Sequence, residues 1–235
     1  MSYNKKAHLR ANIKAIRTVL ILDKEKRAAT DDEKLLMQGY SGFGGLKCVL
    51  SPANSLTDIS SWAKSELDLF PLVAELHRTI RDNTSSEKEY KQYFDSIRNS
   101  VLTAFYTPPE VAQAIGDAIK ESGIEVNRFL DPSAGMGEFS RGFTPFSDSS
   151  IEKISFEKDL LTGKILSHLH SDDKYNKVKI EGFETIESRY NNYFDVVSSN
   201  IPFGEMSVFD ASFMKQDQLH RNSTRAIHNY FFIRA

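Results

Sequence analysis

The chain has 235 residues, of which 40% are hydrophobic, and its formal net charge at pH 7 is −2. That length suits one medium-sized α/β domain with an added region, while the near-neutral charge excludes a strong overall positive field for attracting nucleic acid. The single cysteine, Cys48, excludes an intramolecular disulfide and a metal site built from several cysteines. No apolar run is long enough to span a membrane and no signal peptide is apparent, so we expect a soluble, intracellular protein without a membrane partner.

Residues 1–100 are predicted to form a helical region. Apolar residues recur at helical spacing in the first 27 residues, and a capping box at Thr30 begins a second helix that should end near Gly39. The first helix is basic, which is typical of a solvated face but also suits contact with a phosphate backbone. Four glycines in the seven residues Gly39–Gly45 predict irregular backbone. No Gly-Lys-Ser/Thr follows them, so a nucleotide triphosphate site is not indicated.

Residues 101–235 are predicted to form a second region, in which short strands alternate with helices. This alternation predicts an α/β fold with a parallel, doubly wound sheet. One helix should open at Pro108 and Pro109 with Val111 and Ile115 among its apolar positions, and another, within residues 161–169, suits packing on the sheet. The predicted strands are Val126–Leu130, Lys153–Phe156, Val178–Ile180 and Phe194–Ser199.

The strongest local pattern follows the first of these strands. The strand ends at Asp131, and the small-residue turn Pro-Ser-Ala-Gly-Met-Gly at residues 132–137 leads into a helix. Such a turn lets a ligand approach the backbone at the carboxyl edge of an open sheet. The third glycine of a dinucleotide site, expected near Ser140, is missing. An acid before the turn repels pyrophosphate but suits an ammonium group, so Asp131 favours S-adenosylmethionine over NAD. An ordinary strand–helix turn is the alternative.

Two other strand ends carry candidate functional side chains. Glu157 follows the second strand, where a carboxylate can accept hydrogen bonds from both ribose hydroxyls of a nucleoside. The fourth strand leads into Asn200, Ile201, Pro202 and Phe203. The side-chain carbonyl of Asn200 and the backbone carbonyl of Ile201 offer two acceptors to an exocyclic amine, and Phe203 can stack on an unstacked base. Catalysis by such an arrangement is mainly positioning of a neutral amine.

Three segments together resemble the gamma-class N6-adenine DNA methyltransferases of type I restriction–modification systems. They are Phe-Tyr-Thr-Pro-Pro-Glu-Val at residues 105–111, the strand end and glycine turn at residues 130–137, and Asn-Ile-Pro-Phe at residues 200–203. The last segment, with Gly42–Leu46, further resembles the methylase regions of methylase–helicase proteins of bacterial mobile elements and phages. The resemblance covers about residues 101–235. It implies a Rossmann-like methyltransferase that transfers a methyl group from S-adenosylmethionine to N6 of adenine in DNA.

The resemblance also implies roles for individual residues. The implied cofactor-binding residues are Phe105, Thr107, Asp131, Pro132, Ala134, Gly135, Gly137, Glu157 and Phe183. The implied catalytic residues, which would hold the target adenine, are Asn200, Ile201, Pro202 and Phe203. Among the first group, Asp131 would take the cofactor ammonium, Glu157 the ribose, and Phe183 would lie against the cofactor adenine. His228–Phe231 resembles the helix after the catalytic loop, whose aromatic residues line the target pocket. No metal is implied.

Two positions depart from the family pattern. Ile201 replaces the first proline of the usual Asn/Asp-Pro-Pro-aromatic segment, which preserves the backbone carbonyl but makes the loop less rigid. Gly182 stands where an acid often reads the amine of the cofactor adenine, and Glu184 is the candidate to replace that acid.

The resemblance further implies DNA, with the target adenine flipped out of the duplex, as the partner of a cytoplasmic protein of a bacterium or phage. The chain stops at Ala235, after the fourth strand, so we expect a truncated domain that lacks the C-terminal half of its polypeptide or a specificity subunit. Its strands should lie in the order 3-2-1-4 with helices on both faces and strand four as an exposed edge. The 235-residue chain alone is expected to be inactive.

Two other functions stay open from the sequence. One is a cofactor- and DNA-binding module that has lost catalysis and serves a larger helicase-like protein. The other is a methyltransferase that acts on glutamine in protein or on RNA, because an amide nitrogen needs the same two acceptors. The Phe-Tyr-Thr-Pro segment ahead of the glycine turn favours the DNA enzymes.

Overall fold

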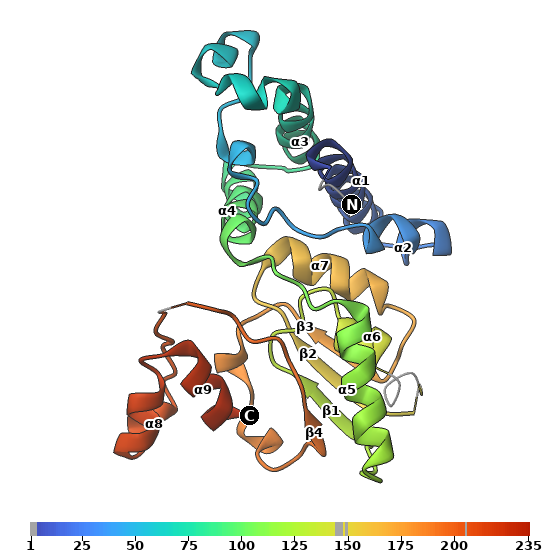
Figure 1. Ribbon diagram of the computed structural model, residues 1–235, viewed down its shortest axis with the longest axis vertical. Coiled ribbons are helices and arrows are strands. Elements are labelled where there is room, and N and C mark those ends of the chain that lie inside the picture. The colour runs from blue at the N-terminus through green and yellow to red at the C-terminus, as the bar shows by residue number, and fades with distance from the viewer. Residues whose placement is uncertain (1–3, 144–147, 149, 205) are drawn as a thin grey trace. The chain divides into compact units, whose positions relative to one another are not determined.

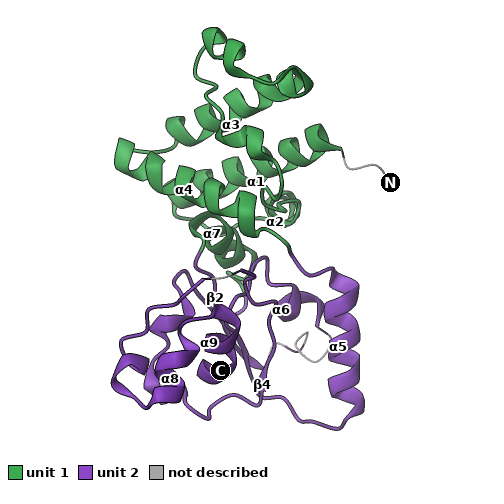
Figure 2. Ribbon diagram, turned by 60° about the vertical axis from the view of Figure 1, so that its left-hand side comes forward, with its two compact units in different colours: residues 1–105, 159–172 green, residues 106–158, 173–235 purple. Residues whose placement is uncertain are grey.

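The chain divides into two compact units. A computed structural model describes residues 4–143, 148, 150–204 and 206–235 (Figure 1). One unit comprises residues 1–105 with 159–172, and the other comprises residues 106–158 with 173–235 (Figure 2). No helix within the described ranges is long and apolar enough to cross a membrane.

The first unit is helical, as predicted. Its α-helices are α1 (Lys5–Glu25), α2 (Asp31–Gln38), α3 (Phe70–Asp82), α4 (Glu87–Thr103) and α7 (Leu160–Leu169), and its short 3-10 helices are η1 (Lys47–Leu50), η2 (Leu56–Ser61) and η3 (Lys64–Leu69). The predicted capping box is confirmed, because Glu33 N donates to Thr30 Oγ1 and Thr30 N donates to the Glu33 carboxylate. Helix α2 ends at Gln38, and Gly39 follows it as predicted.

Helix α7 lies between β2 and β3 in the chain, yet it belongs to the first unit. The sequence suggested a helix packed on the sheet, whereas the contacts of α7 within its unit are with α1, α2 and α4. Leu161, Ile165 and Leu166 are fully buried, and on the polar side Asp23 of α1 accepts from His168 Nε2 at 2.9 Å and pairs with Lys164. An apolar stripe records that a helix is buried, but not which element buries it.

The glycine-rich segment Gly39–Gly45 is irregular, as predicted, and it is held between α1 and α4. The buried side chain of Asn12 donates to Gly42 O and accepts from Ser41 N at 3.0 Å. Phe43 N donates to Ser100 Oγ of α4 at 2.9 Å, and the Phe43 ring is fully buried. These contacts satisfy the backbone of the segment and give it a structural role.

Replacing Gly44 with alanine is expected to destabilise the first unit. An added Cβ would lie 2.6 Å from the backbone carbonyl oxygen of Ala104, so the backbone must shift at Gly44 or at Ala104. We expect a loss of about 1–3 kcal/mol in the free energy of unfolding, measured by chemical denaturation. Gly142→Ala is the matched control, because its Cβ would meet only Pro109 O, at 3.9 Å. Equal stability of the two variants would contradict the close approach.

The second unit contains a four-stranded sheet. Its strands are β1 (Arg128–Asp131), β2 (Glu152–Phe156), β3 (Asn176–Lys179) and β4 (Val196–Val197), and its α-helices are α5 (Pro109–Glu121), α6 (Glu138–Gly142), α8 (Gln218–Ser223) and α9 (Ile227–Arg234). Its 3-10 helices are η5 (Phe183–Thr185), η6 (Ser188–Tyr190) and η7 (Phe213–Lys215). All strand pairs are parallel, and the order β3-β2-β1-β4 is the one predicted.

Both faces of the sheet are covered, because neighbouring residues of a strand point to opposite sides. Phe129 of β1 packs with α5 and α6 through Ala112, Phe139 and Phe143. Its neighbour Leu130 belongs to the opposite core, whose other buried members are Ile154, Phe156, Phe183, Ile186, Phe213, Ile227, Tyr230 and Phe231. Figure 1 shows α5 and α6 on one side of the sheet and α9 on the other. The unit is therefore a mixed α/β fold around a parallel sheet.

Two elements differ in detail from the prediction. Helix α5 buries Ala112 and Gly116, while Val111 is 48% exposed and Ile115 is also exposed, because small side chains allow the closer approach to the sheet. Strand β4 is only Val196–Val197, shorter than predicted, and it ends the strand order, with Val197 exposed.

Candidate functional site

The candidate site lies at the switch point of the sheet, between β1 and β4. From β1 the chain proceeds to β2 and β3 on one side, and β4 then pairs with β1 on the other. In open α/β sheets, the carboxyl ends of the two strands beside such a switch point border the usual ligand crevice. Here the glycine turn follows β1 and the Asn200 segment follows β4, so the two segments lie at the carboxyl ends of two neighbouring strands.

The glycine turn is tied to the end of β2. Ala134 N donates to Phe156 O at 2.8 Å, and Gly135 N donates to Glu157 Oε2 at 2.8 Å. Gly135 adopts a φ of +53°, and a Cβ there would lie 3.0 Å from the ring of Tyr106. Glycine is therefore required at 135 by both its backbone conformation and the neighbouring ring. The half-buried Glu157 carboxylate lies directly against the turn.

Asp131 lies beneath the turn. Its Oδ1 accepts from Ser199 Oγ at 2.7 Å and from Ser133 N at 3.2 Å, while Oδ2 is buried and has no hydrogen-bond partner among the described residues. Burial raises the pKa of Asp131 to about 7, against the effect of the hydrogen bonds from Ser199 and Ser133. The carboxyl group is completely buried, so in this structure it anchors the turn rather than facing a ligand. A buried acceptor without a donor nonetheless suits a ligand that brings one.

The Asn200 segment continues directly from β4. Ser198 N donates to Leu130 O at 3.1 Å, which extends the pairing with β1 by one residue. Asn200, Ile201 and Pro202 are half-buried, and the Ile201 side chain packs on the core that contains Leu130. That packing supplies part of the restraint that proline would provide. Phe203, the last residue of the segment, is 70% exposed, so its ring is open to a stacking partner.

The remaining predicted cofactor residues are found in several environments. Pro132, Ala134 and Gly137 are buried in the turn, and Thr107 is half-buried at the start of the second unit. Phe105 is exposed and is the last residue of the first unit.

Phe183, which the sequence placed against the cofactor adenine, is a core residue in this structure. Its ring is 5.6 Å from that of Phe156 and 5.4 Å from that of Phe231, and only 2% of the residue is exposed. Tyr230 and Phe231, predicted as lining of a target pocket, are buried in the same core. Bulky aromatic residues near a strand end serve a core as readily as a pocket, and the sequence does not separate the two.

Glu184 was the predicted replacement for the acid that often reads the amine of the cofactor adenine. Its carboxylate bends back over Gly182, so that a Cβ at Gly182 would collide with it. It also pairs with Lys158, just after β2, at 2.8 Å. The pair brings a charged carboxylate close to the segment that carries Glu157.

The sequence reasoning missed two residues, Ser199 and Asp210. Asp210 is almost fully buried and accepts from Tyr230 Oη at 2.8 Å and from Ser212 N at 2.7 Å, with the guanidinium of Arg234 3.4 Å away. Burial and the bond to Asp210 raise the pKa of Tyr230. Because these partners lie up to 24 positions from Asp210 in the chain, no local motif could reveal the network.

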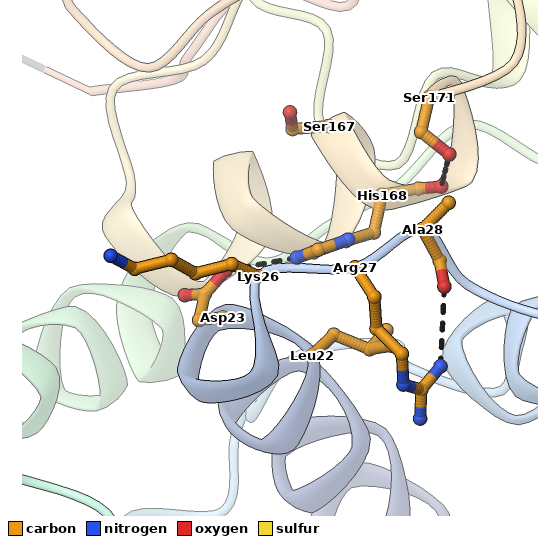
Figure 3. Close-up of a pocket in the computed structure, with 8 residues that line it drawn as sticks. All are labelled: Leu22, Asp23, Lys26, Arg27, Ala28, Ser167, His168 and Ser171. Atoms are coloured by element: carbon orange, nitrogen blue, oxygen red, sulfur yellow. Dashed lines mark hydrogen bonds and ion pairs between the residues drawn. The ribbon is translucent and has the colours of Figure 1, made fainter.

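A separate cavity of about 460 Å³ lies in the first unit between α1 and α7 (Figure 3). Its lining residues are Leu22, Asp23, Lys26, Arg27, Ala28, Ser167, His168 and Ser171. Asp23 pairs with Lys164 and His168, and Arg27 pairs with Glu25 and Glu33. These charges are neutralised within the unit, so the cavity does not point to a particular ligand.

Comparison with known proteins gives one curated relative. The chain is 33% identical over 104 residues to Defense against restriction protein B of Escherichia phage P1, a match that covers 44% of this chain and 4% of that protein. The chain thus corresponds to a small part of the length of this relative. No protein-family model matches the chain, and no solved structure matches it.

These findings correct the family expectation. The chain resembled gamma-class N6-adenine DNA methyltransferases in three short segments, yet no family model matches, and the curated relative is named for defence against restriction rather than for methyl transfer. Short strand-end motifs report local geometry, since any parallel strand that ends in a tight turn selects similar small residues. The chain is therefore not a member of that family by these comparisons.

Proposed function

We propose that the second unit binds S-adenosylmethionine at the carboxyl edge of its sheet and positions the N6 amino group of adenine in DNA for methylation. The observation that carries this proposal is that hydrogen bonds of 2.7 to 3.1 Å join the glycine turn to Glu157 and, on the β4 side, to Ser199, the residue before Asn200. The parallel order β3-β2-β1-β4 is compatible with a Rossmann-like methyltransferase.

The residues of the turn fit the cofactor in chemical type. Glu157 is a half-buried carboxylate beside Gly135, which has no side chain to block a ligand. This arrangement suits the ribose hydroxyls of a nucleoside. Asp131 is fully buried beneath the turn and has a raised pKa, and an ammonium group bound against the turn would stabilise its charged form. S-adenosylmethionine, when bound, supplies the methyl group.

The Asn200 segment would hold the target. The Asn200 side-chain carbonyl and the Ile201 backbone carbonyl accept hydrogen bonds from the two protons of an amino group, which fixes the direction of its nitrogen. The exposed ring of Phe203 stacks on the base that carries the amino group. These residues orient a neutral amine and need not remove a proton before it reacts.

The choice of DNA draws support from the relative. That protein is named for defence against restriction, and methylation of bases is one chemical means of protecting DNA from restriction enzymes. A DNA substrate in a bacterium or phage-infected cell implies a cytoplasmic location. The decisive experiment is an assay of labelled methyl transfer from S-adenosylmethionine to unmethylated DNA, RNA and protein, with the 235-residue chain and with longer chains that contain it. Labelling of RNA or protein in place of DNA would refute the substrate assignment.

Replacing Glu157 with glutamine is expected to weaken S-adenosylmethionine binding about 10- to 150-fold, because a hydrogen bond to a charged group contributes about 1.5–3 kcal/mol. Glutamine keeps an acceptor for Gly135 N, so the turn should persist. Isothermal titration calorimetry measures the affinity. The control is Glu125→Gln, which removes the same charge from an exposed position before β1, at the amino end of the sheet. An unchanged affinity in the Glu157 variant would remove the basis for a nucleoside at this edge.

A further inference from the structure

Ser199, the residue before Asn200, makes side-chain hydrogen bonds that join the end of β4 to the end of β1 and the glycine turn. Its hydroxyl donates to Asp131 Oδ1 at 2.7 Å and accepts from Ser133 N at 3.1 Å. The carbonyl oxygen of Ser133 lies 3.3 Å from the same hydroxyl. A single hydroxyl on the β4 side is thus bonded to the strand end and to the turn on the β1 side.

Ser199 lies between the end of the β4 backbone pairing and the proposed target segment. The backbone pairing of β4 with β1 ends with the bond from Ser198 N to Leu130 O. Ser199 is therefore the first residue beyond that ladder, and its side chain takes over the alignment where the backbone stops. The proposed target acceptor, Asn200, is the next residue. A displacement of the turn that moves Ser199 therefore also moves Asn200.

Asp131 makes the anchor rigid. The carboxyl group is fully buried and holds Ser199 and Ser133 on the same oxygen, Oδ1. Because Ser133 N also donates to Ser199 Oγ, the three groups form a closed cluster in which each bond restrains the other two.

We propose that Ser199 is a positioning residue that couples ligand binding at the glycine turn to the placement of Asn200–Phe203. The inference rests on the proposed function in one respect, that S-adenosylmethionine occupies the turn. When the ligand restrains residues 132–137, the hydroxyl bridge restrains the target segment as well, so the amino-group acceptors are held more firmly when the cofactor is present.

Backbone hydrogen exchange tests the coupling with the 235-residue chain, with and without S-adenosylmethionine. The variants are Ser199→Ala, Ser199→Thr, which keeps the hydroxyl, and Ser198→Ala, which shortens the neighbouring half-buried side chain without touching the bridge. Without ligand, exchange at the amides of residues 200, 201, 203 and 204 should be at least about fivefold faster in Ser199→Ala than in the wild type, because each hydrogen bond lost contributes about 1 kcal/mol. With ligand, the turn should be protected in every variant, whereas residues 200–204 should gain protection in all except Ser199→Ala.

Two results would overturn the inference: full ligand-induced protection of residues 200–204 in Ser199→Ala, or an equal loss in Ser198→Ala, which would indicate general loosening. Failure of Ser199→Thr to restore the wild-type pattern would also overturn it, because the hydroxyl would then not be the active group. If S-adenosylmethionine protects nothing in the wild type, the proposed function fails. The ligand-free comparison of Ser199→Ala with the wild type would still decide whether the hydroxyl holds the segment.

Discussion

Replacing Asn200 with alanine is expected to reduce methyl transfer to adenine by about 100-fold or more, because misplacing a reacting group by about 1 Å can cost that much. The substitution removes one of the two acceptors proposed for the amino group and leaves the Ile201 carbonyl in place. Affinity for S-adenosylmethionine should stay within about twofold, since the turn, Glu157 and the Ser199 bridge are untouched. Methyl transfer is measured under single-turnover conditions, and cofactor affinity by calorimetry. Both use the 235-residue chain or, if that chain is inactive, a longer chain that contains it and transfers methyl groups.

Asn191→Ala serves as the control, because Asn191 is exposed in the turn before β4 and has no place in the proposed site. The two readouts separate the possible failures. Near-normal transfer by the Asn200 variant would mean that the target binds elsewhere. Loss of transfer together with cofactor affinity would instead assign the segment a structural role at the carboxyl edge.

The second large effect concerns pH and Asp131. The pKa of this carboxyl rises from 3.8 to about 7 in the folded protein, chiefly through burial. Between these values the folded chain keeps a proton that the unfolded chain has lost, so the free energy of unfolding falls as the pH rises from about 4 to about 7. A shift of about three pH units, at about 1.4 kcal/mol each, gives a total loss of about 4 kcal/mol.

Asp131→Asn isolates this contribution, because asparagine keeps an acceptor for Ser199 and Ser133 but does not ionise. Urea unfolding at pH 5 and pH 8 should show the wild type losing about 3 kcal/mol more than the variant over that range. Titration of the Asp131 carboxyl carbon by NMR gives the folded pKa directly. Equal pH dependence of the two proteins, or a midpoint near 4, would mean that the carboxyl group is hydrated and not buried beneath the turn.

Features set by neighbours in the chain could be predicted from the sequence. The capping box at Thr30, the opening of α5 at Pro109 and the turn after β1 were all apparent, because each depends on side chains within about four residues of one another. The strand order was also predicted, as part of what the resemblance implied, and the structure has that order. The meeting of Asp131, Glu157 and Asn200 at one edge follows from that order.

The fates of the aromatic and apolar residues could not be predicted in the same way. Phe183 and Tyr230 are buried side by side, although the sequence suggested a ligand and a target pocket for them. Val111 was among the expected apolar positions of α5 but is exposed, since Ala112 and Gly116 allow the tighter helix–sheet contact. Periodicity gives the face of a helix only approximately, and the packing partner decides between neighbouring positions.

By itself, the sequence determined the helical first region, the parallel sheet and the segments that reach its carboxyl edge, because periodicity, caps and turn residues act over short separations. Tertiary structure alone decided that α7 joins the first unit and that Asp131 is buried beneath the turn rather than open to a ligand. It alone revealed the Ser199 bridge and the Asp210 network, whose partners are 66 and 20 positions apart in the sequence. A hydrogen bond between such residues depends on where the whole sheet brings the chain, and no local pattern records it.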